Sequence, residues 1–159
     1  MTLAMWGSLA TVGPVGRLRP APGTWGSLFG LVTGFGLASL SPGLLEIATL
    51  LVIVFGTIAA NHHQIETGSK DASEVVIDEV AGQWIALLVI PIDWCWALAA
   101  FLLFRFFDIT KIGPIGMVEK WPGGVGVMAD DVIAGVFAAL CLWLAQLLQF
   151  ASRLRQRNW

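Results

Sequence analysis

Residues 132–151 read VIAGVFAALCLWLAQLLQFA, a run without a charged side chain. An apolar helix of about 20 residues matches the hydrocarbon thickness of a bilayer. This run is the clearest membrane-spanning candidate in the chain and predicts an integral membrane protein. The arginines at 153, 155 and 157 that follow it are typical of an anchor at the membrane interface.

Other apolar stretches precede this run in pairs. Residues 25–40 and 44–60, joined by a Ser-Pro-Gly turn, predict a helical hairpin. Residues 80–90 and 94–107 form a second pair, in which each stretch is shorter than a straight crossing. We therefore expect an all-α fold: a compact multi-helix integral membrane protein with about four to five membrane-embedded helices, forming one domain over residues 1–159.

Two polar connections, residues 61–79 and 108–131, separate these pairs. Because two hairpins flank the first connection, both should emerge on one membrane face and build one site with the N-terminal segment. A final crossing would put the tail arginines on the opposite face, against the positive-inside tendency. Either the last helix does not cross the membrane, or the tail is an exception to that tendency.

Composition supports a membrane protein and excludes other classes. The chain is 57% hydrophobic and 13% charged, with a mean hydropathy of +0.78. The net charge of -2 and the lack of a basic patch argue against a nucleic-acid partner. Cys95 and Cys141 lie in apolar runs without metal or redox spacing, so we expect both to be buried. The N-terminus has no basic region or cleavage site typical of a removable signal peptide.

The acidic residues predict a metal site. Nine of the eleven lie in the two polar connections: Glu66, Asp71, Glu74, Asp78, Glu79, Asp108, Glu119, Asp130 and Asp131. Such a concentration of negative charge on one face of a small protein calls for a counterion. Because the ligands are hard oxygens, with only His62 and His63 as imidazoles, Mg²⁺ or Mn²⁺ fits better than zinc.

The acids also fall at predicted helix ends, which leaves an alternative open. Asp78-Glu79 and Asp130-Asp131 each precede an apolar helix, where carboxylates can cap free N–H groups and interact favourably with the helix dipole. Capping does not explain Asp108, which follows a helix, nor the recurrence of paired carboxylates. Metal ligation explains both features.

Two further segments suggest phosphate chemistry. PAPGTWGSL, residues 20–28, combines a stiff turn with the hydroxyls of Thr24 and Ser27 at a helix start, which suits phosphate binding or a simple helix entry. FRFFDITK, residues 104–111, spaces Arg105, Asp108 and Lys111 three apart. That spacing suits either a salt-bridge ladder along a helix or a site where cations hold phosphate oxygens.

Together these segments resemble the phosphatidylglycerophosphatase A family. The resemblance rests on three blocks in order: PAPGTWGSL at 20–28, DASEVVIDEVAGQWI at 71–85 and FRFFDITKIGPIGMVEKWPGGVGVMADDVIAG at 104–135. Ile112 stands where the family usually has proline, and Arg17 and Arg19 replace small or apolar residues. The resemblance implies Mg²⁺ dependence, hydrolysis of phosphatidylglycerophosphate to phosphatidylglycerol, and a multi-pass protein of the bacterial inner membrane with its site facing the cytoplasm.

On this basis we expect the site to divide into two groups. Metal ligands are expected among Glu66, Asp78, Glu79, Asp108, Asp130 and Asp131, with Asp71 and Glu66 as outer ligands or general base. Phosphate contacts are expected from Thr24, Ser27, Arg105 and Lys111. A metal-activated water is the preferred nucleophile, and a phosphoaspartate is the alternative. Rival functions are a small cation transporter or channel, a phosphatase or transferase acting on another lipid phosphate, and a membrane scaffold.

Overall fold

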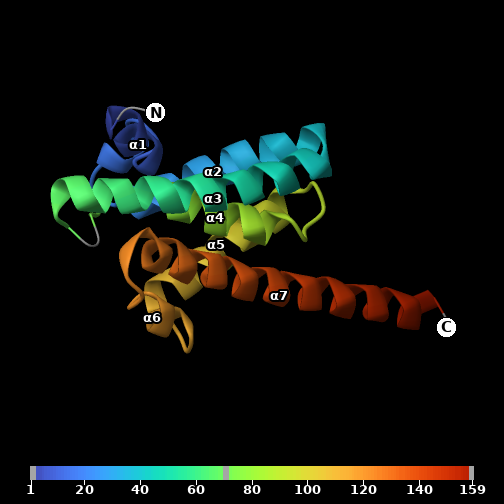
Figure 1. The fold of residues 1–159 in the computed structure, drawn as a ribbon. Coiled ribbons are helices and arrows are strands. Elements are labelled where there is room, and N and C mark those ends of the chain that lie inside the picture. Colours follow the sequence, from blue (N-terminus) through green and yellow to red (C-terminus); the bar gives the residue numbers. More distant parts are fainter. Residues whose placement is uncertain (1–2, 70–71, 158–159) are drawn as a thin grey trace.

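The computed structural model describes residues 3–69 and 72–157, and these residues form a helical bundle (Figure 1). Its helices are α1 (Leu3–Ala10), η1 (Val15–Arg17, a 3₁₀ helix), α2 (Pro22–Leu40), α3 (Pro42–Thr67), α4 (Ile77–Leu87), α5 (Trp94–Thr110), α6 (Ile115–Val118) and α7 (Gly123–Arg157). The expected all-α class is confirmed.

Both predicted hairpins form. Pro42 occupies the first turn of α3, where a backbone N–H would have no acceptor within the helix, so the lack of one costs no hydrogen bond. Ser41, in an extended conformation, links α3 to α2. Asp93 caps α5 by accepting hydrogen bonds from the backbone N–H groups of Cys95 at 2.9 Å and Trp96 at 3.1 Å. These two turns lie at one end of the bundle, and the longer connections lie at the other (Figure 1).

Helix α4 is the short centre of the bundle. It has 11 residues, nearly all of them buried, and it packs against α2, α3, α5 and α7. Val80, Trp84 and Leu87 join a hydrophobic core with Phe104 of α5 and Leu142 of α7. A helix that is covered on every side needs apolar residues all round, which explains why this segment resembled a short membrane helix.

Helix α7 is longer than the sequence pattern predicted. It has 35 residues and begins at Gly123, so Asp130 and Asp131 lie two turns inside the helix and do not open it. The glycine-rich stretch before them is therefore helical and not a flexible loop. Its glycines allow close approach to α3: the N–H of Gly124 donates to Oδ1 of Asn61 at 3.3 Å, and a Cβ there would come within 2.6 Å of the Asn61 nitrogen.

The predicted ends of two other helices also shift. Helix α3 continues through residues 61–67, and α5 includes Asp108 in its last turn. The polar connections are thus shorter than expected, because the polar residues at these ends belong to the helices and make helical backbone hydrogen bonds. Cys95 is exposed and Cys141 is half-buried, so the expectation that both are buried is wrong.

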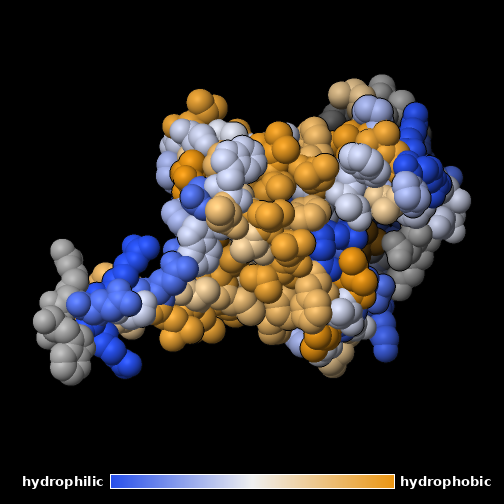
Figure 2. Space-filling model, turned by 180° about the vertical axis from the view of Figure 1, so that it is seen from behind, coloured by the Kyte–Doolittle hydropathy of each residue, from blue (hydrophilic) through white to orange (hydrophobic). Residues whose placement is uncertain are grey.

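The surface is apolar around the middle of the molecule. Helices α3 and α7 are long and apolar enough to cross a membrane by length and composition. Large hydrophobic side chains such as Leu50, Leu102 and Leu148 are more than half exposed. Figure 2 shows this apolar band, with hydrophilic residues gathered toward the two ends. The last turns of α7 project from the end that carries the short hairpin turns (Figure 1).

Candidate active site

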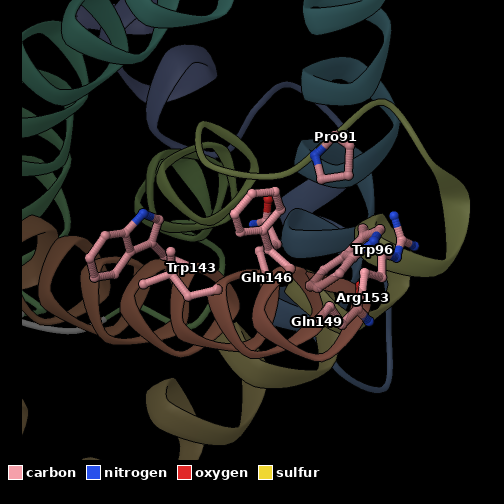
Figure 3. Close-up of a pocket in the computed structure, with 8 residues that line it drawn as sticks. Pro91, Trp96, Trp143, Gln146, Gln149 and Arg153 are labelled. Carbon is pink, nitrogen blue, oxygen red and sulfur yellow. The ribbon is translucent and has the colours of Figure 1, made fainter. Parts of the chain in front are cut away.

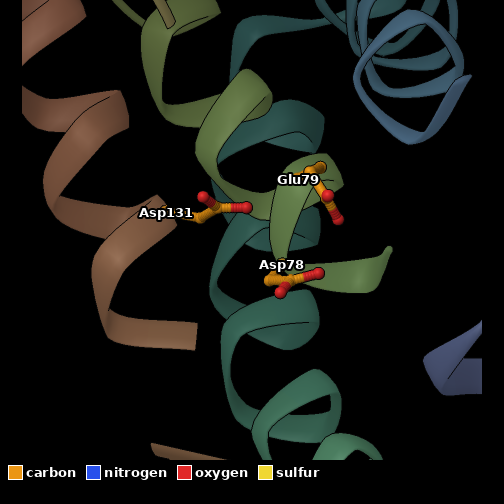
Figure 4. A group of neighbouring side chains, drawn as sticks. All are labelled: Asp78, Glu79 and Asp131. Atoms are coloured by element: carbon orange, nitrogen blue, oxygen red, sulfur yellow. The ribbon is translucent and has the colours of Figure 1, made fainter. Parts of the chain in front are cut away.

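Three carboxylates from two helices lie close together (Figure 4). They lie at the end of the bundle that carries the long connections, where α4 begins (Figure 1). Asp78 and Glu79 lie in the first turn of α4, and Asp131 lies on α7. One carboxylate oxygen from each residue lies within 4.8 Å of those from the other two. Three acids this close, in a largely buried position, repel one another unless protons or a cation neutralise them.

Glycine brings the two helices together one turn beyond these acids. A Cβ on Gly135 of α7 would come within 3.0 Å of the Cα of Gly82 on α4 and would overlap its carbonyl oxygen. Larger residues at either position would push the helices apart. This contact fixes the distance between the α4 acids and Asp131.

Several of these carboxylate oxygens lack a partner. Oδ1 of Asp78 and Oε2 of Glu79 are buried without a hydrogen bond. Burial, followed by repulsion from Glu79, raises the pKa of Asp78 well above its usual range. Burial and the neighbouring Asp131 carboxylate raise the pKa of Glu79 from 4.5 to about 8.

This donor set fits a hard divalent cation. Mg²⁺ and Mn²⁺ prefer carboxylate oxygens, and Mg²⁺ is commonly held by one or two carboxylates together with substrate phosphate. A cation among Asp78, Glu79 and Asp131 would bind the unpartnered oxygens and offset their repulsion. Val76, the N-cap of α4, makes no side-chain cap, and Oδ1 of Asp78 is unbonded, so capping does not account for this buried oxygen. Both acids lie in the first turn of α4, where the helix dipole also favours negative charge.

A cavity of about 350 Å³ opens beside the acids and contains cationic groups as well. Arg105 and Lys111 line it together with Asp108 and Asp130, and so does the start of α2 at residues 21–24. The cavity thus combines oxygen ligands for a cation with donors for an anion.

Arg105 is held by two partners. Its Nη1 donates to Oδ2 of Asp108 one turn away on α5 and to Oγ of Ser27 on α2 at 3.3 Å. Ser27 is fully buried, and its hydroxyl also donates to the Gly23 carbonyl at 2.8 Å. Ser27 therefore positions Arg105 from behind and does not line the cavity, contrary to its expected direct phosphate contact.

Lys111 leaves the helix and points to a different acid. It follows α5 with a φ of 47°, an uncommon left-handed conformation, so the predicted Arg105-Asp108-Lys111 ladder forms only in its first half. Its Nζ donates to Oδ2 of Asp130 at 2.6 Å and to Oε1 of Glu119 at 2.8 Å. Burial alone would lower the pKa of Lys111, but these two hydrogen bonds outweigh it and raise the pKa.

The N-terminus of α2 offers further donors to the cavity. Helix α2 begins at Pro22, and Ala21 before it makes no side-chain cap. The first N–H groups of a helix have no intrahelical acceptor and attract anions. Gly23 brings this backbone close to Glu79, because a Cβ at Gly23 would overlap its Oε1 and lie 3.3 Å from Nη1 of Arg105.

Most of the predicted site residues thus line one cavity: Thr24, Asp78, Glu79, Arg105, Asp108, Lys111, Asp130 and Asp131. Glu66 does not, because it is exposed on α3 near Gly7 of α1. Asp71 lies outside the described residues. His63 pairs with Glu74 at 3.0 Å, and His62 stacks on Trp6 with ring centroids 5.3 Å apart, so both imidazoles face other partners than the three carboxylates.

Two residues of this region were missing from the predicted site. Glu119 shares Lys111 with Asp130, and Asn61 anchors the first turn of α7. Glu119 was visible as one of the nine acids in the connections. No signal in the sequence pointed to Asn61, since its role depends on the packing of α3 against α7.

Known proteins are similar to this chain over most of its length. The sequence pattern of the phosphatidylglycerophosphatase A family matches residues 8–146. Phosphatidylglycerophosphatase A of Haemophilus influenzae is 42% identical over 134 residues, which cover 82% of each chain. The Escherichia coli protein of the same name is 36% identical over 138 residues, covering 85% of this chain and 80% of its own.

A third relative carries a different name. A putative phosphatidylinositol-3-phosphatase of Bacteroides thetaiotaomicron is 42% identical over 134 residues, covering 79% of this chain and 84% of its own. No solved structure matches the chain. The match over residues 8–146 contains every cavity-lining residue described above, and both the identities and the coverage are high: this chain belongs to the phosphatidylglycerophosphatase A family.

Proposed function

We propose that the chain is a metal-dependent lipid phosphatase that hydrolyses the terminal phosphomonoester of phosphatidylglycerophosphate, releasing phosphatidylglycerol and inorganic phosphate. The observation that carries this proposal is the meeting of Asp78, Glu79 and Asp131 beside Arg105 and Lys111 in one cavity. Hydrolysis of a phosphate ester needs acidic groups that hold the cation and basic groups that hold the phosphate, close enough to act together.

In this proposal Asp78, Glu79 and Asp131 hold Mg²⁺, with Mn²⁺ as the substitute. A bound divalent cation supplies positive charge that offsets the negative charge of the phosphoryl oxygens. Arg105 has further N–H donors beyond those used by Asp108 and Ser27, and these contact the phosphate. Thr24 and the first N–H groups of α2 bind the phosphate from the other wall of the cavity.

The reaction forms one bond and breaks another. The oxygen of an attacking water bonds to phosphorus, the bond from phosphorus to the glycerol oxygen breaks, and that oxygen takes up a proton. Because Asp108 and Asp130 are each occupied by an ion pair, the better acceptor for the proton of the water is an oxygen of Asp78 or Glu79 that does not bind the cation. Lys111 orients Asp130 through the hydrogen bond from its Nζ to Oδ2.

The acyl chains would lie along α2. An apolar groove of about 640 Å³ is lined by Phe29, Leu37, Leu40 and Trp84, with Gly36 in its wall. It lies on the same helix whose first turn lines the catalytic cavity. From Phe29 to Leu40 the helix rises about 17 Å, close to one leaflet, or about half of the ~30 Å hydrocarbon core.

This arrangement favours a protein embedded in the bacterial inner membrane with several membrane-embedded helices and the site at the cytoplasmic face. Among the described residues, Arg17, Arg19, Arg105, Lys111 and Lys120 lie near the catalytic end, whereas three arginines lie in the last turns of α7. The positive-inside tendency therefore favours a cytoplasmic site, despite the arginine tail.

Another lipid phosphate is the main alternative substrate, because the relative named as a putative phosphatidylinositol-3-phosphatase is as similar as the Haemophilus protein. Cation transport is less favoured. The other acids of the described chain gather at one end, whereas Glu46 lies in the second turn of α3 and Asp93 is the N-cap of α5, both at the opposite end, so these acids do not form a path along the helices.

The test is phosphate release by the purified chain in detergent micelles, with phosphatidylglycerophosphate or phosphatidylinositol 3-phosphate and with Mg²⁺ or EDTA. We expect faster release from phosphatidylglycerophosphate, only with the cation, and loss of release in Asp131→Asn. Faster release from the inositol lipid would assign the alternative substrate. No release from either lipid would refute the phosphatase proposal.

A further inference from the structure

A second cavity lies beside α7 (Figure 3), toward the end of the bundle that carries the short hairpin turns and is opposite the catalytic site (Figure 1). It has a volume of about 460 Å³ and lies between the α4–α5 connection and the last turns of α7. Gln146 joins these two elements, because its Nε2 donates to the Val89 carbonyl at 2.9 Å. The cavity is therefore built by packed elements and is not a gap beside a loose helix end.

Its lining combines aromatic rings with a guanidinium group. Trp96 of α5 and Trp143 and Phe150 of α7 supply the rings, and Arg153 supplies the charge. Within residues 3–69 and 72–157, no carboxylate forms an ion pair with Arg153. The acid of the α4–α5 connection, Asp93, accepts instead from the backbone at the start of α5.

The position of this cavity matches the opposite surface of a bilayer. Arg153 follows Asp131 by 22 residues on one continuous helix, which corresponds to about 33 Å. That separation is close to the ~30 Å thickness of the hydrocarbon core. When the catalytic carboxylates lie at one headgroup layer, Arg153 lies at the other, where tryptophan is also favoured.

We propose that this cavity binds the headgroup of an anionic phospholipid from the leaflet opposite the catalytic site. Arg153 contacts the phosphodiester, since a guanidinium group pairs with phosphate through two parallel hydrogen bonds. Trp96, Trp143 and Phe150 contact the glycerol and the upper acyl chains. The bound lipid joins α7 to the α4–α5 connection and stabilises the far end of the bundle.

The test compares the thermal unfolding of the purified full chain in detergent with added phosphatidylserine or phosphatidylcholine. Phosphatidylserine is neither the proposed substrate nor the proposed product, so the measurement does not depend on catalysis. We expect phosphatidylserine to raise the unfolding temperature by several degrees more than phosphatidylcholine. Arg153→Gln should lose at least half of this difference, and Arg155→Gln, two residues further on and outside the cavity, should keep it.

Size-exclusion elution and far-ultraviolet circular dichroism establish that both variants are folded before the comparison. Equal lipid responses of Arg153→Gln and Arg155→Gln would overturn the proposal, and so would equal stabilisation by the two lipids. Because unfolding is measured without substrate, these results are independent of whether the chain hydrolyses phosphatidylglycerophosphate.

Discussion

Gly82 of α4 lies directly against the backbone of Asp131 on α7: a Cβ at Gly82 would come within 2.6 Å of the Asp131 carbonyl oxygen. This contact couples the packing of two helices to the geometry of the acidic site, because Asp78 and Glu79 lie one turn before Gly82. The position of these carboxylates thus depends on residues that carry no functional group.

Gly82→Ala should therefore impair catalysis through helix separation. The added methyl group also meets the ring of Phe104, so it cannot be accommodated without movement of α7 or α5. Overpacking of this kind costs about 1–3 kcal/mol of stability, and a shift of about 1 Å in the acids can reduce turnover ~100-fold. Phosphate release and thermal unfolding measure the two effects.

Gly43→Ala is the matched control, since a Cβ at that helical position would meet only Oγ of Ser41 at 3.8 Å, an ordinary contact. It should retain parental activity and stability. If Gly82→Ala were as active as Gly43→Ala, the contact between α4 and α7 would not set the geometry of the site.

Asp131→Asn should abolish activity but raise the stability of the metal-free protein. Removing one of three crowded, buried carboxylates relieves repulsion in the metal-free protein, so the variant should unfold at a higher temperature than the parent in EDTA. Mg²⁺ should stabilise the parent and have little effect on the variant, which should also lack activity. A variant that responds to Mg²⁺ like the parent would show that Asp131 is not a ligand.

The two partners of Lys111 should contribute unequally. The side chain of Asp130 is 9% exposed and that of Glu119 is 42% exposed, so solvent screens the second pair more strongly. Lys111→Met leaves Asp130 buried without its partner and should reduce phosphate release about 100-fold, as truncation of a buried charge pair costs about 2–5 kcal/mol. Glu119→Gln should change it less than about fivefold. Equal losses in the two variants would contradict this ranking.

The acidic site was more predictable from sequence than the helix boundaries. Carboxylates for a cation and cations for a phosphate are chemically recognisable, and Asp78, Asp108 and Asp131 all line the cavity. Hydrophobic pattern alone could not place the start of α7 at Gly123, because the eight residues from Gly123 to Asp130 include three glycines, a residue type that disfavours helices. Close packing explains the choice of glycine: Gly123 and Gly124 lie against α3, and Gly126 lies against the backbone of Glu119 and Trp121.

The same limit applies to Glu66 and Ser27, neither of which lines the cavity. Side-chain direction decides their partners: Glu66 faces outward beside α1, and Ser27 faces inward behind Arg105. Neither direction can be inferred from spacing until the packing of the neighbouring helices is known.

Cys95 offers a test of orientation. It is exposed at the start of α5, at the end opposite the catalytic site, whereas Cys141 is half-buried in α7. If the site faces the cytoplasm, a membrane-impermeant maleimide should label Cys95 in intact bacterial cells with their outer membrane permeabilised. A Cys141→Ala background leaves Cys95 as the single thiol, and Cys95→Ala provides the blank. Labelling only after the inner membrane is opened would place the catalytic site on the outer face.

Gly36→Leu should reveal whether the groove along α2 holds an acyl chain. The new side chain meets open space in the protein and projects into the groove, so it should displace lipid without disturbing the bundle. Phosphate release from a long-chain substrate should fall several-fold, mainly through a higher KM, whereas release from a dihexanoyl substrate should hardly change. Gly43→Leu, in the first turn of α3 and outside the groove, adds the same side chain as a control. If Gly36→Leu slowed both substrates equally, the groove would not contact the acyl chain, and the lipid would have to reach the catalytic cavity along another face of the bundle.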